Sequence, residues 1–137
     1  MAVEISVVYE GELHTEATHG PSTVTLNTDA PVDNRGRGTS FSPTDLVATA
    51  LGCCMLTLMG IAALDRELNI EGARVKVFKE MIADPHRRIK SLRSIVTMPR
   101  RLPEKQRKIL EKAALTCPVH QSLAEKVERP VEFVWPK

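Results

Sequence analysis

Hydrophobic and polar residues alternate along several short stretches of the chain, and this period-two pattern predicts β-strands. The pattern is clearest near the start, where Val3, Ile5 and Val7 alternate with Glu4 and Ser6. Strands are expected at residues 2–9, 13–19, 23–27, 73–82, 88–98 and 131–135. Turn-forming residues separate the first three stretches, so these strands are expected to form an antiparallel meander.

The longest apolar stretch follows a motif that is typical of a helix start. Ser42 suits the N-cap, Pro43 the first helical position, and Asp45 the third, from which a carboxylate can reach back to the cap. The pattern predicts one long helix to about Leu68, and its residues 46–64 include no charged side chain. A helix that is apolar all round is buried on every side, so we expect a second copy of the chain to cover part of it.

The same stretch is close to the length that crosses a membrane. Threonine and glycine interrupt it, and its flanks have neither an aromatic belt nor a basic cluster, so a buried core helix is expected instead. The first residues lack the pattern of a signal peptide, and the odd count of three cysteines does not suit a disulfide framework. These features predict a cytoplasmic protein with no membrane partner.

The order of the elements indicates the fold class. Two strands follow the long helix, and then come an amphipathic helix over residues 103–115, a short helical piece from Cys117 and a last strand. Strands and helices without regular alternation are typical of α+β folds. With 137 residues, 42% of them hydrophobic and 26% charged, the chain is expected to form a single domain, residues 1–137.

The charge of the chain argues against a nucleic-acid partner. The formal net charge is only +2, and aromatic residues do not alternate with basic ones as they do in RNA-binding motifs. Basic residues gather near the start of the second helix, where we expect only a solvated helix face. They are Arg100, Arg101, Lys105, Arg107 and Lys108.

Cysteines far apart in the sequence carry the candidate chemistry. Cys53 and Cys54 lie in the middle of the long helix, and Cys117 lies at the head of the short helical piece, where the helix N-terminus is expected to lower its pKa. A thiolate that attacks a peroxide becomes a sulfenic acid, which a second cysteine converts to a disulfide. Cys54 with Cys117 is the first candidate pair and Cys53 with Cys117 the second, because neighbours in one helix are poor disulfide partners.

Four other residues are candidates for supporting roles. His120 follows Cys117 by three residues and either stabilises its thiolate or is a surface or capping histidine. Asp45 is interpreted first as a helix cap. Arg35 and Arg37 lie in a glycine-flanked loop, where they either supply a cation to a thiolate or remain surface charges. The other histidines are scattered without an evident partner, and adjacent cysteines lack the usual zinc-ligand spacing, so neither a metal nor a cofactor is expected.

Two motifs resemble those of a known family, the OsmC/Ohr proteins. Residues 42–46, Ser-Pro-Thr-Asp-Leu, with the small-residue helix that ends in Gly-Cys-Cys at 52–54, resemble the central-helix motif of the family. Residues 117–120, Cys-Pro-Val-His, resemble its second-cysteine motif. The order of strands and helices is also similar over nearly the whole chain. The spacing from Pro43 to the second cysteine of the pair matches the family, and this assigns the first thiol to Cys54.

The resemblance implies an OsmC-like fold in which antiparallel strands wrap around a long buried central helix, in an intertwined homodimer with its thiol sites near the subunit interface. It also implies the reduction of small organic hydroperoxides. In similar proteins a peroxidatic cysteine, here Cys54, attacks the peroxide, a resolving cysteine, here Cys117, forms the disulfide, and a dithiol reductant restores both.

The sequence departs from the best-studied members at two places. Thr44 stands where they carry a glutamate, and the acid comes one residue later, at Asp45. Residues 1–34 contain no arginine or lysine, whereas those members carry a thiol-activating arginine in this region. The pattern is similar to that of a less characterised branch of the family. The alternatives to a peroxidase are a non-catalytic dimer that binds a small hydrophobic ligand and a redox-sensing dimer.

Overall fold

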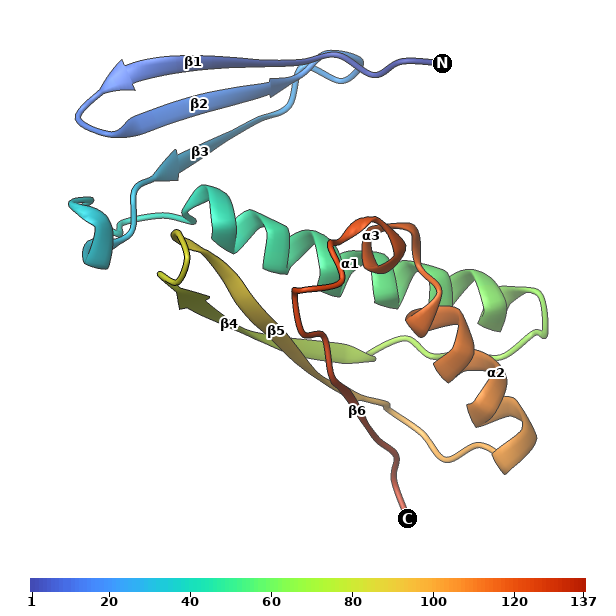
Figure 1. Cartoon of the computed structure of the whole chain (residues 1–137). Coiled ribbons are helices and arrows are strands. Elements are labelled where there is room, and N and C mark those ends of the chain that lie inside the picture. Colours follow the sequence, from blue (N-terminus) through green and yellow to red (C-terminus); the bar gives the residue numbers. More distant parts are fainter. The chain divides into compact units, whose positions relative to one another are not determined.

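The computed structural model describes all residues, 1–137, and divides them into two compact units, Met1–Val47 and Ala48–Lys137. The long helix α1 (Pro43–Leu64) begins in the first unit and continues into the second. Figure 1 shows the elements of each unit in the colours of the sequence. The α+β class predicted from the order of strands and helices is confirmed, because two three-stranded sheets and the helices occur without regular alternation.

The first unit is built on a three-stranded antiparallel sheet in the order β1-β2-β3. Its strands are β1 (Ile5–Gly11), β2 (His14–His19) and β3 (Thr25–Asp29), and a short 3₁₀ helix, η1 (Val32–Asn34), follows them. Val7 lies opposite Ala17, which in turn lies opposite Leu26, so these apolar side chains share one face of the sheet. The turn between β1 and β2 begins at Gly11, whose φ of 86° is in the region that glycine adopts without strain.

The second unit contains a three-stranded sheet in the order β4-β5-β6. Its strands are β4 (Arg74–Ile82), β5 (Arg88–Thr97) and β6 (Val131–Val134). The β4–β5 pair is antiparallel as predicted, but β6 runs parallel to β5, so the prediction of antiparallel strands is wrong for this pair. The reason is the connection, because α2 (Glu104–Leu115) and α3 (Pro118–Ser122) carry the chain back along β5, so that β6 begins opposite Ser94 and runs in the same direction.

One face of α1 packs against this sheet. Leu51, Met55 and Met59 are wholly buried on that face. Gly52 brings the helix close to β4, since a Cβ atom at this position would lie 3.0 Å from Val75 Cγ1 and 3.2 Å from Val77 Cγ2. The core of the second unit therefore lies between α1 and the sheet.

The helix ends at Leu64, four residues before the predicted end at Leu68. Glu67 adopts a left-handed conformation with φ of 54°, and the N–H of Leu68 donates to the carbonyl of Ala63 at 2.9 Å. This reversed bond closes the helix in the manner of a Schellman motif. Leu68 is half-buried and lines one pocket with Ala63 and Leu64, so the apolar pattern continues past the end of the helix.

The other face of α1 is not covered by the rest of the second unit. Ile61 is 50% exposed and Leu64 is 77% exposed, and Cys53 and Thr57 are exposed on the same side. Within the second unit, α1 is thus buried on one side, whereas burial on every side was predicted. Length and composition alone would allow α1 to cross a membrane, a test that core helices of soluble proteins also pass. Its buried face and its place against the sheet fit a core helix.

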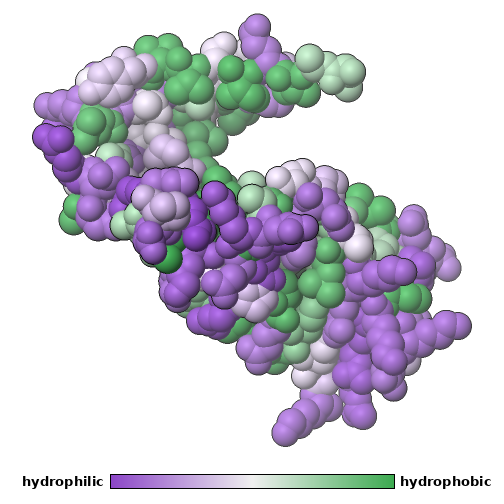
Figure 2. All heavy atoms as spheres, viewed as in Figure 1, coloured by the Kyte–Doolittle hydropathy of each residue, from purple (hydrophilic) through white to green (hydrophobic).

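The sheet of the first unit also leaves apolar side chains exposed. Ile5, Val7 and Tyr9 are each more than half exposed, and Leu26 beside them is 46% exposed. Figure 2 shows this hydrophobic surface over the strands of the first unit. Each unit therefore has an apolar surface that its own residues leave exposed.

Candidate functional site

The three cysteines differ in their exposure, and all are free thiols. Cys54 lies at the edge of the buried face of α1 and is half-buried, whereas Cys53 is exposed on the uncovered face. The difference follows from helix geometry, because successive side chains point about 100° apart. Cys117 is wholly buried.

Cys117 is fixed by the junction between two helices. α2 ends at Leu115, and the N–H of Cys117 donates to the carbonyl of Ala114 at 3.4 Å. Cys117 is the N-cap of α3, with Pro118 in the first turn, and its Sγ accepts a hydrogen bond from the N–H of His120 at 3.3 Å. The short helical piece that begins with Pro118 is therefore present as predicted.

The structure brings Cys54 and Cys117 together. They are separated by 62 residues of sequence, yet the side chain of Cys54 acts on the Cys117 thiol both as a hydrogen-bonding partner and through its charge. The first turn of α3 lies beside the middle of α1, and this places the two sulfur groups next to each other. Cys53, on the exposed side of α1, does not take part in this contact.

The predicted lowering of the Cys117 pKa is wrong. Burial raises the pKa of the Cys117 thiol and is the largest cause. The N–H of His120 lowers this pKa, the hydrogen bond and the charge of Cys54 raise it, and the N–H of Val119 lowers it least. A wholly buried thiolate loses more solvation than one short helical turn restores. Cys117 therefore keeps its proton when a negative charge forms on its neighbour.

His120 does not supply a cation. Burial lowers the pKa of the His120 imidazole, and the positive charge of Arg129 lowers it further, so the ring is neutral at physiological pH. Its contact with Cys117 is made by the backbone N–H and not by the ring. Arg129, which the sequence analysis did not single out, is held in place because its Nη1 donates to the carbonyls of Ala124 at 2.9 Å and Val127 at 3.1 Å.

Asp45 is a helix cap, as interpreted from the sequence. The N–H of Ser42 donates to Asp45 Oδ2 at 2.9 Å, and the N–H of Asp45 donates to Ser42 Oγ at 3.1 Å. These reciprocal bonds complete a capping box. Ser42 is almost wholly buried, so its hydroxyl has a structural use at the start of the helix.

The two loop arginines lie in the first unit, whereas both paired thiols lie in the second. Arg37 forms an ion pair with Glu12, and both side chains are largely exposed. Arg35 ends the 3₁₀ helix η1 in a left-handed conformation with φ of 68°. The side chain of Arg37 thus takes part in an ion pair on the surface.

The sequence analysis also missed a histidine–aspartate pair that holds this loop. His14 Nδ1 lies 2.6 Å from Asp29 Oδ1, and Asp29, only 3% exposed, also accepts from the hydroxyl and the N–H of Thr39. The hydrogen bond with Asp29 raises the pKa of His14, and the bonds from Thr39 and His14 lower the pKa of Asp29. His14 and Asp29 face each other in the β2–β3 register, so pairing the two predicted strands would have found them.

The chain is similar to a known family and to solved structures. Residues 36–131 match the OsmC family, described as OsmC-like protein. A crystal structure from Psychrobacter arcticus 273-4, provisionally described as an osmotic stress induced and detoxification response protein, is 45% identical, with a TM-score of 0.89 over 94% of this chain and 93% of that one. No curated protein sequence matches the chain.

Two more distant structures share the fold. The organic hydroperoxide resistance protein OsmC from Legionella pneumophila is 16% identical, with a TM-score of 0.77 over 98% of this chain and 97% of that one. The organic hydroperoxide resistance protein OhrB of Bacillus subtilis is 14% identical, with a TM-score of 0.72 over 97% of this chain and 98% of that one. At these identities the likeness concerns the fold alone.

Proposed function

The chain belongs to the OsmC-like protein family, and from this premise we propose that it reduces organic hydroperoxides through two cysteine thiols, Cys54 and Cys117. Family membership supports a role in hydroperoxide resistance, because structural neighbours from Legionella pneumophila and Bacillus subtilis are named for it. The observation that carries the two-thiol proposal is the contact between these side chains, one half-buried and the other wholly buried.

In the proposed reaction Cys54 acts first. Its thiolate sulfur attacks the distal oxygen of the hydroperoxide, the O–O bond breaks, and the alkoxide takes up a proton and leaves as an alcohol. The sulfur has lost two electrons and is now a sulfenic acid. Cys54 is favoured over Cys53 for this step because it is the one whose side chain contacts a second thiol.

Cys117 then acts as the resolving thiol. Its sulfur attacks the sulfenic sulfur of Cys54, an S–S bond forms, and the sulfenic oxygen leaves as water with the proton of the Cys117 thiol. Burial and the charge of Cys54 raise the pKa of Cys117, so this thiol retains its proton until the first step is complete. A dithiol reductant, either a small molecule or a protein, then returns both cysteines to thiols by thiol–disulfide exchange.

The supporting residues have narrower roles in this proposal. Asp45 caps the helix that carries Cys54, and His120 contributes its N–H to the sulfur of Cys117. Arg35 and Arg37 are the proposed source of a cation for the Cys54 thiolate. Arg37 is already paired with Glu12, so Arg35 is the stronger candidate of the two.

We further propose that the protein works as a cytoplasmic homodimer and that residues 1–137 act as one OsmC-like domain. The uncovered apolar faces of α1 and of the β1–β3 sheet support a second copy as the cover. The family match over residues 36–131 crosses the boundary between the two units, which supports a single domain. No metal or cofactor is needed for the proposed steps.

A non-catalytic dimer that binds a small hydrophobic ligand is the second candidate, and the complete burial of Cys117 favours it. Steady-state consumption of cumene hydroperoxide with a dithiol distinguishes the two. The peroxidase proposal expects turnover in the wild type and in Cys53→Ser, and its loss in Cys54→Ser. Equal consumption by wild type and Cys54→Ser, or no consumption by the wild type, would overturn it. A redox sensor would instead form the disulfide rapidly and turn over slowly.

A further inference from the structure

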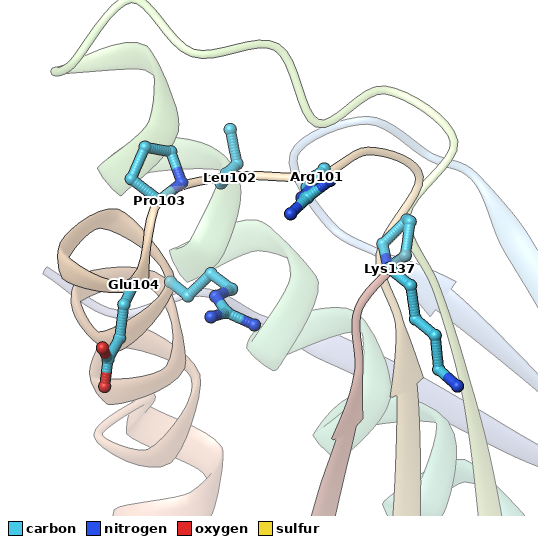
Figure 3. A pocket seen from close by; sticks show the side chains of 7 residues that line it. Arg101, Leu102, Pro103, Glu104 and Lys137 are labelled. Atoms are coloured by element: carbon cyan, nitrogen blue, oxygen red, sulfur yellow. The ribbon is translucent and has the colours of Figure 1, made fainter.

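A pocket of about 620 Å³ lies at the start of α2, in a part of the second unit that contains neither of the paired thiols. Three cationic side chains line it, those of Arg101, Arg107 and Lys137, together with one carboxylate, that of Glu104. In the view of Figure 3, Arg101 and Lys137 lie on one side of the pocket and Glu104 on the other, with its carboxylate directed away from Arg101. The lining therefore has an excess of positive charge.

This charge is not neutralised by the protein. Glu104 points to its own helix, where it forms an ion pair with Lys108 at 3.3 Å. Arg101, Arg107 and Lys137 form no ion pair with any carboxylate. Clustered cations without counter-charges repel one another, and an anion bound among them removes that repulsion.

Arg107 is held in a fixed position at the pocket. Its guanidinium carbon lies 5.9 Å from the ring centroid of Trp135, and Trp135 is itself held by a 2.8 Å hydrogen bond from Nε1 to Glu111 Oε2. The Nε of Arg107 is buried and has no hydrogen-bond acceptor. A buried N–H without an acceptor is costly, so its presence here is unlike an ordinary solvated arginine on a helix face.

The first turn of α2 adds to the same potential. Pro103 occupies the N-cap and provides no side-chain hydrogen bond to the N–H groups of the first turn. These groups carry the positive end of the helix dipole toward the pocket. Leu102, Pro103 and Pro136 complete the lining with apolar surface.

We propose that this pocket binds an organic oxyanion, a carboxylate or phosphate that carries a short apolar chain. The guanidinium groups of Arg101 and Arg107 donate hydrogen bonds to the oxyanion, since their planar forks match carboxylate and phosphate oxygens, and Lys137 adds a point charge. The apolar chain lies on Leu102, Pro103 and Pro136. Two residues that the sequence analysis assigned to a solvated helix face thus form part of a binding site.

The protein contains its own reporter for this site, because Trp135 is its only tryptophan and contacts Arg107. Tryptophan fluorescence of the full-length protein is titrated with hexanoate and with hexyl phosphate at constant ionic strength in chloride. Hexanol tests the apolar chain alone, and inorganic phosphate tests the charge alone. A saturable change is expected with at least one of the two amphiphilic anions, with at least tenfold weaker binding of hexanol.

Matched variants make the test specific. Arg101→Gln, an exposed change outside any helix, and Arg107→Gln are each expected to weaken binding of the anion at least tenfold. Lys105→Gln removes the same charge from an exposed position of α2 that does not line the pocket, and is expected to change affinity less than twofold. Absence of saturation, or equal weakening by Lys105→Gln and Arg101→Gln, would overturn the proposal. The site is independent of the peroxidase, so Cys54→Ser is expected to bind the anion unchanged.

Discussion

Gly52 offers a sharp test of how α1 sits on the sheet, because it shares the helix with a second glycine in different surroundings. A Cβ atom at Gly52 would lie 3.0 Å from Val75 Cγ1 and 3.2 Å from Val77 Cγ2. A Cβ atom at Gly60 would meet nothing within 4 Å. Gly52→Ala and Gly60→Ala therefore make the same chemical change in one helix, the first against valine side chains of β4 and the second where no atom is near.

The two expected magnitudes differ in sign. Replacing a mid-helix glycine by alanine stabilises a protein by about 0.5–1 kcal/mol when nothing obstructs the methyl group. Overpacking a core costs about 1–3 kcal/mol. The methyl groups of Val75 and Val77 need to shift by only a few tenths of an ångström, so we take an overpacking cost of about 1.5 kcal/mol for Gly52→Ala. Gly52→Ala is expected to lower the free energy of unfolding by about 0.5–1 kcal/mol. Gly60→Ala is expected to raise it by about 0.5–1 kcal/mol.

Urea denaturation of both variants at one fixed protein concentration measures the difference, and the fixed concentration removes the effect of mass action on any dimer. The close packing of α1 on β4 is refuted if Gly52→Ala stabilises the protein as much as an unobstructed change should. Destabilisation by Gly60→Ala would contradict the open space that a single chain leaves beside it. Because the proposed second copy covers this face of α1, that result would place Gly60 within the subunit contact.

Further predictions follow from the caps, the histidine–aspartate pair and the thiols. Ser42→Ala removes a hydroxyl that accepts a first-turn N–H, so it is expected to cost about 0.5–2 kcal/mol in urea denaturation, whereas Ser42→Thr, which keeps the hydroxyl, should cost less. The pKa of Asp29 is lowered by Thr39 and His14, so the stability that Asp29 contributes is present at neutral pH and is lost as the pH falls through the pKa of Asp29 in the folded protein. The pKa of His14 is raised chiefly by Asp29, so the stability that His14 contributes is lost as the pH rises through the pKa of His14 in the folded protein. Thermal unfolding from acid to alkaline pH should therefore show a weaker pH dependence at both ends in His14→Gln, and an unchanged profile would contradict the pair. Cys117→Ser should leave the sulfenic acid of Cys54 unresolved, so a sulfenic-acid reagent should label it and excess peroxide should carry it to sulfinic acid faster than in the wild type.

Local signals in the sequence predicted much of the fold. The Ser42–Asp45 capping box is one such signal, because its donors and acceptors lie within one helical turn and need no knowledge of the rest of the chain. Most strands of both sheets were also found from their alternation, which in the second sheet reflects one face turned to the core. The contact between Cys54 and Cys117 was expected from the chemistry of two distant thiols and from the family resemblance.

The errors concern properties that depend on the fold as a whole. The pKa of Cys117 was predicted from its helix alone, whereas burial by the surrounding core has the larger effect. The direction of β6 depends on the path of two helices, and the partner of His14 lies 15 residues away across a strand pair. Such features require the strands to be paired first, and a period-two pattern does not state which strands pair.

The proposed reaction requires that Cys54 and Cys117 exchange electrons as a pair. The direct measurement is the mass of the proteolytic peptides after the dithiol-reduced protein has been treated with one equivalent of cumene hydroperoxide per chain. The account predicts a pair of peptides joined through Cys54 and Cys117, lighter than the sum of the two by two hydrogen atoms and absent from Cys54→Ser. Unmodified thiols, or a linkage that runs through Cys53, would contradict it.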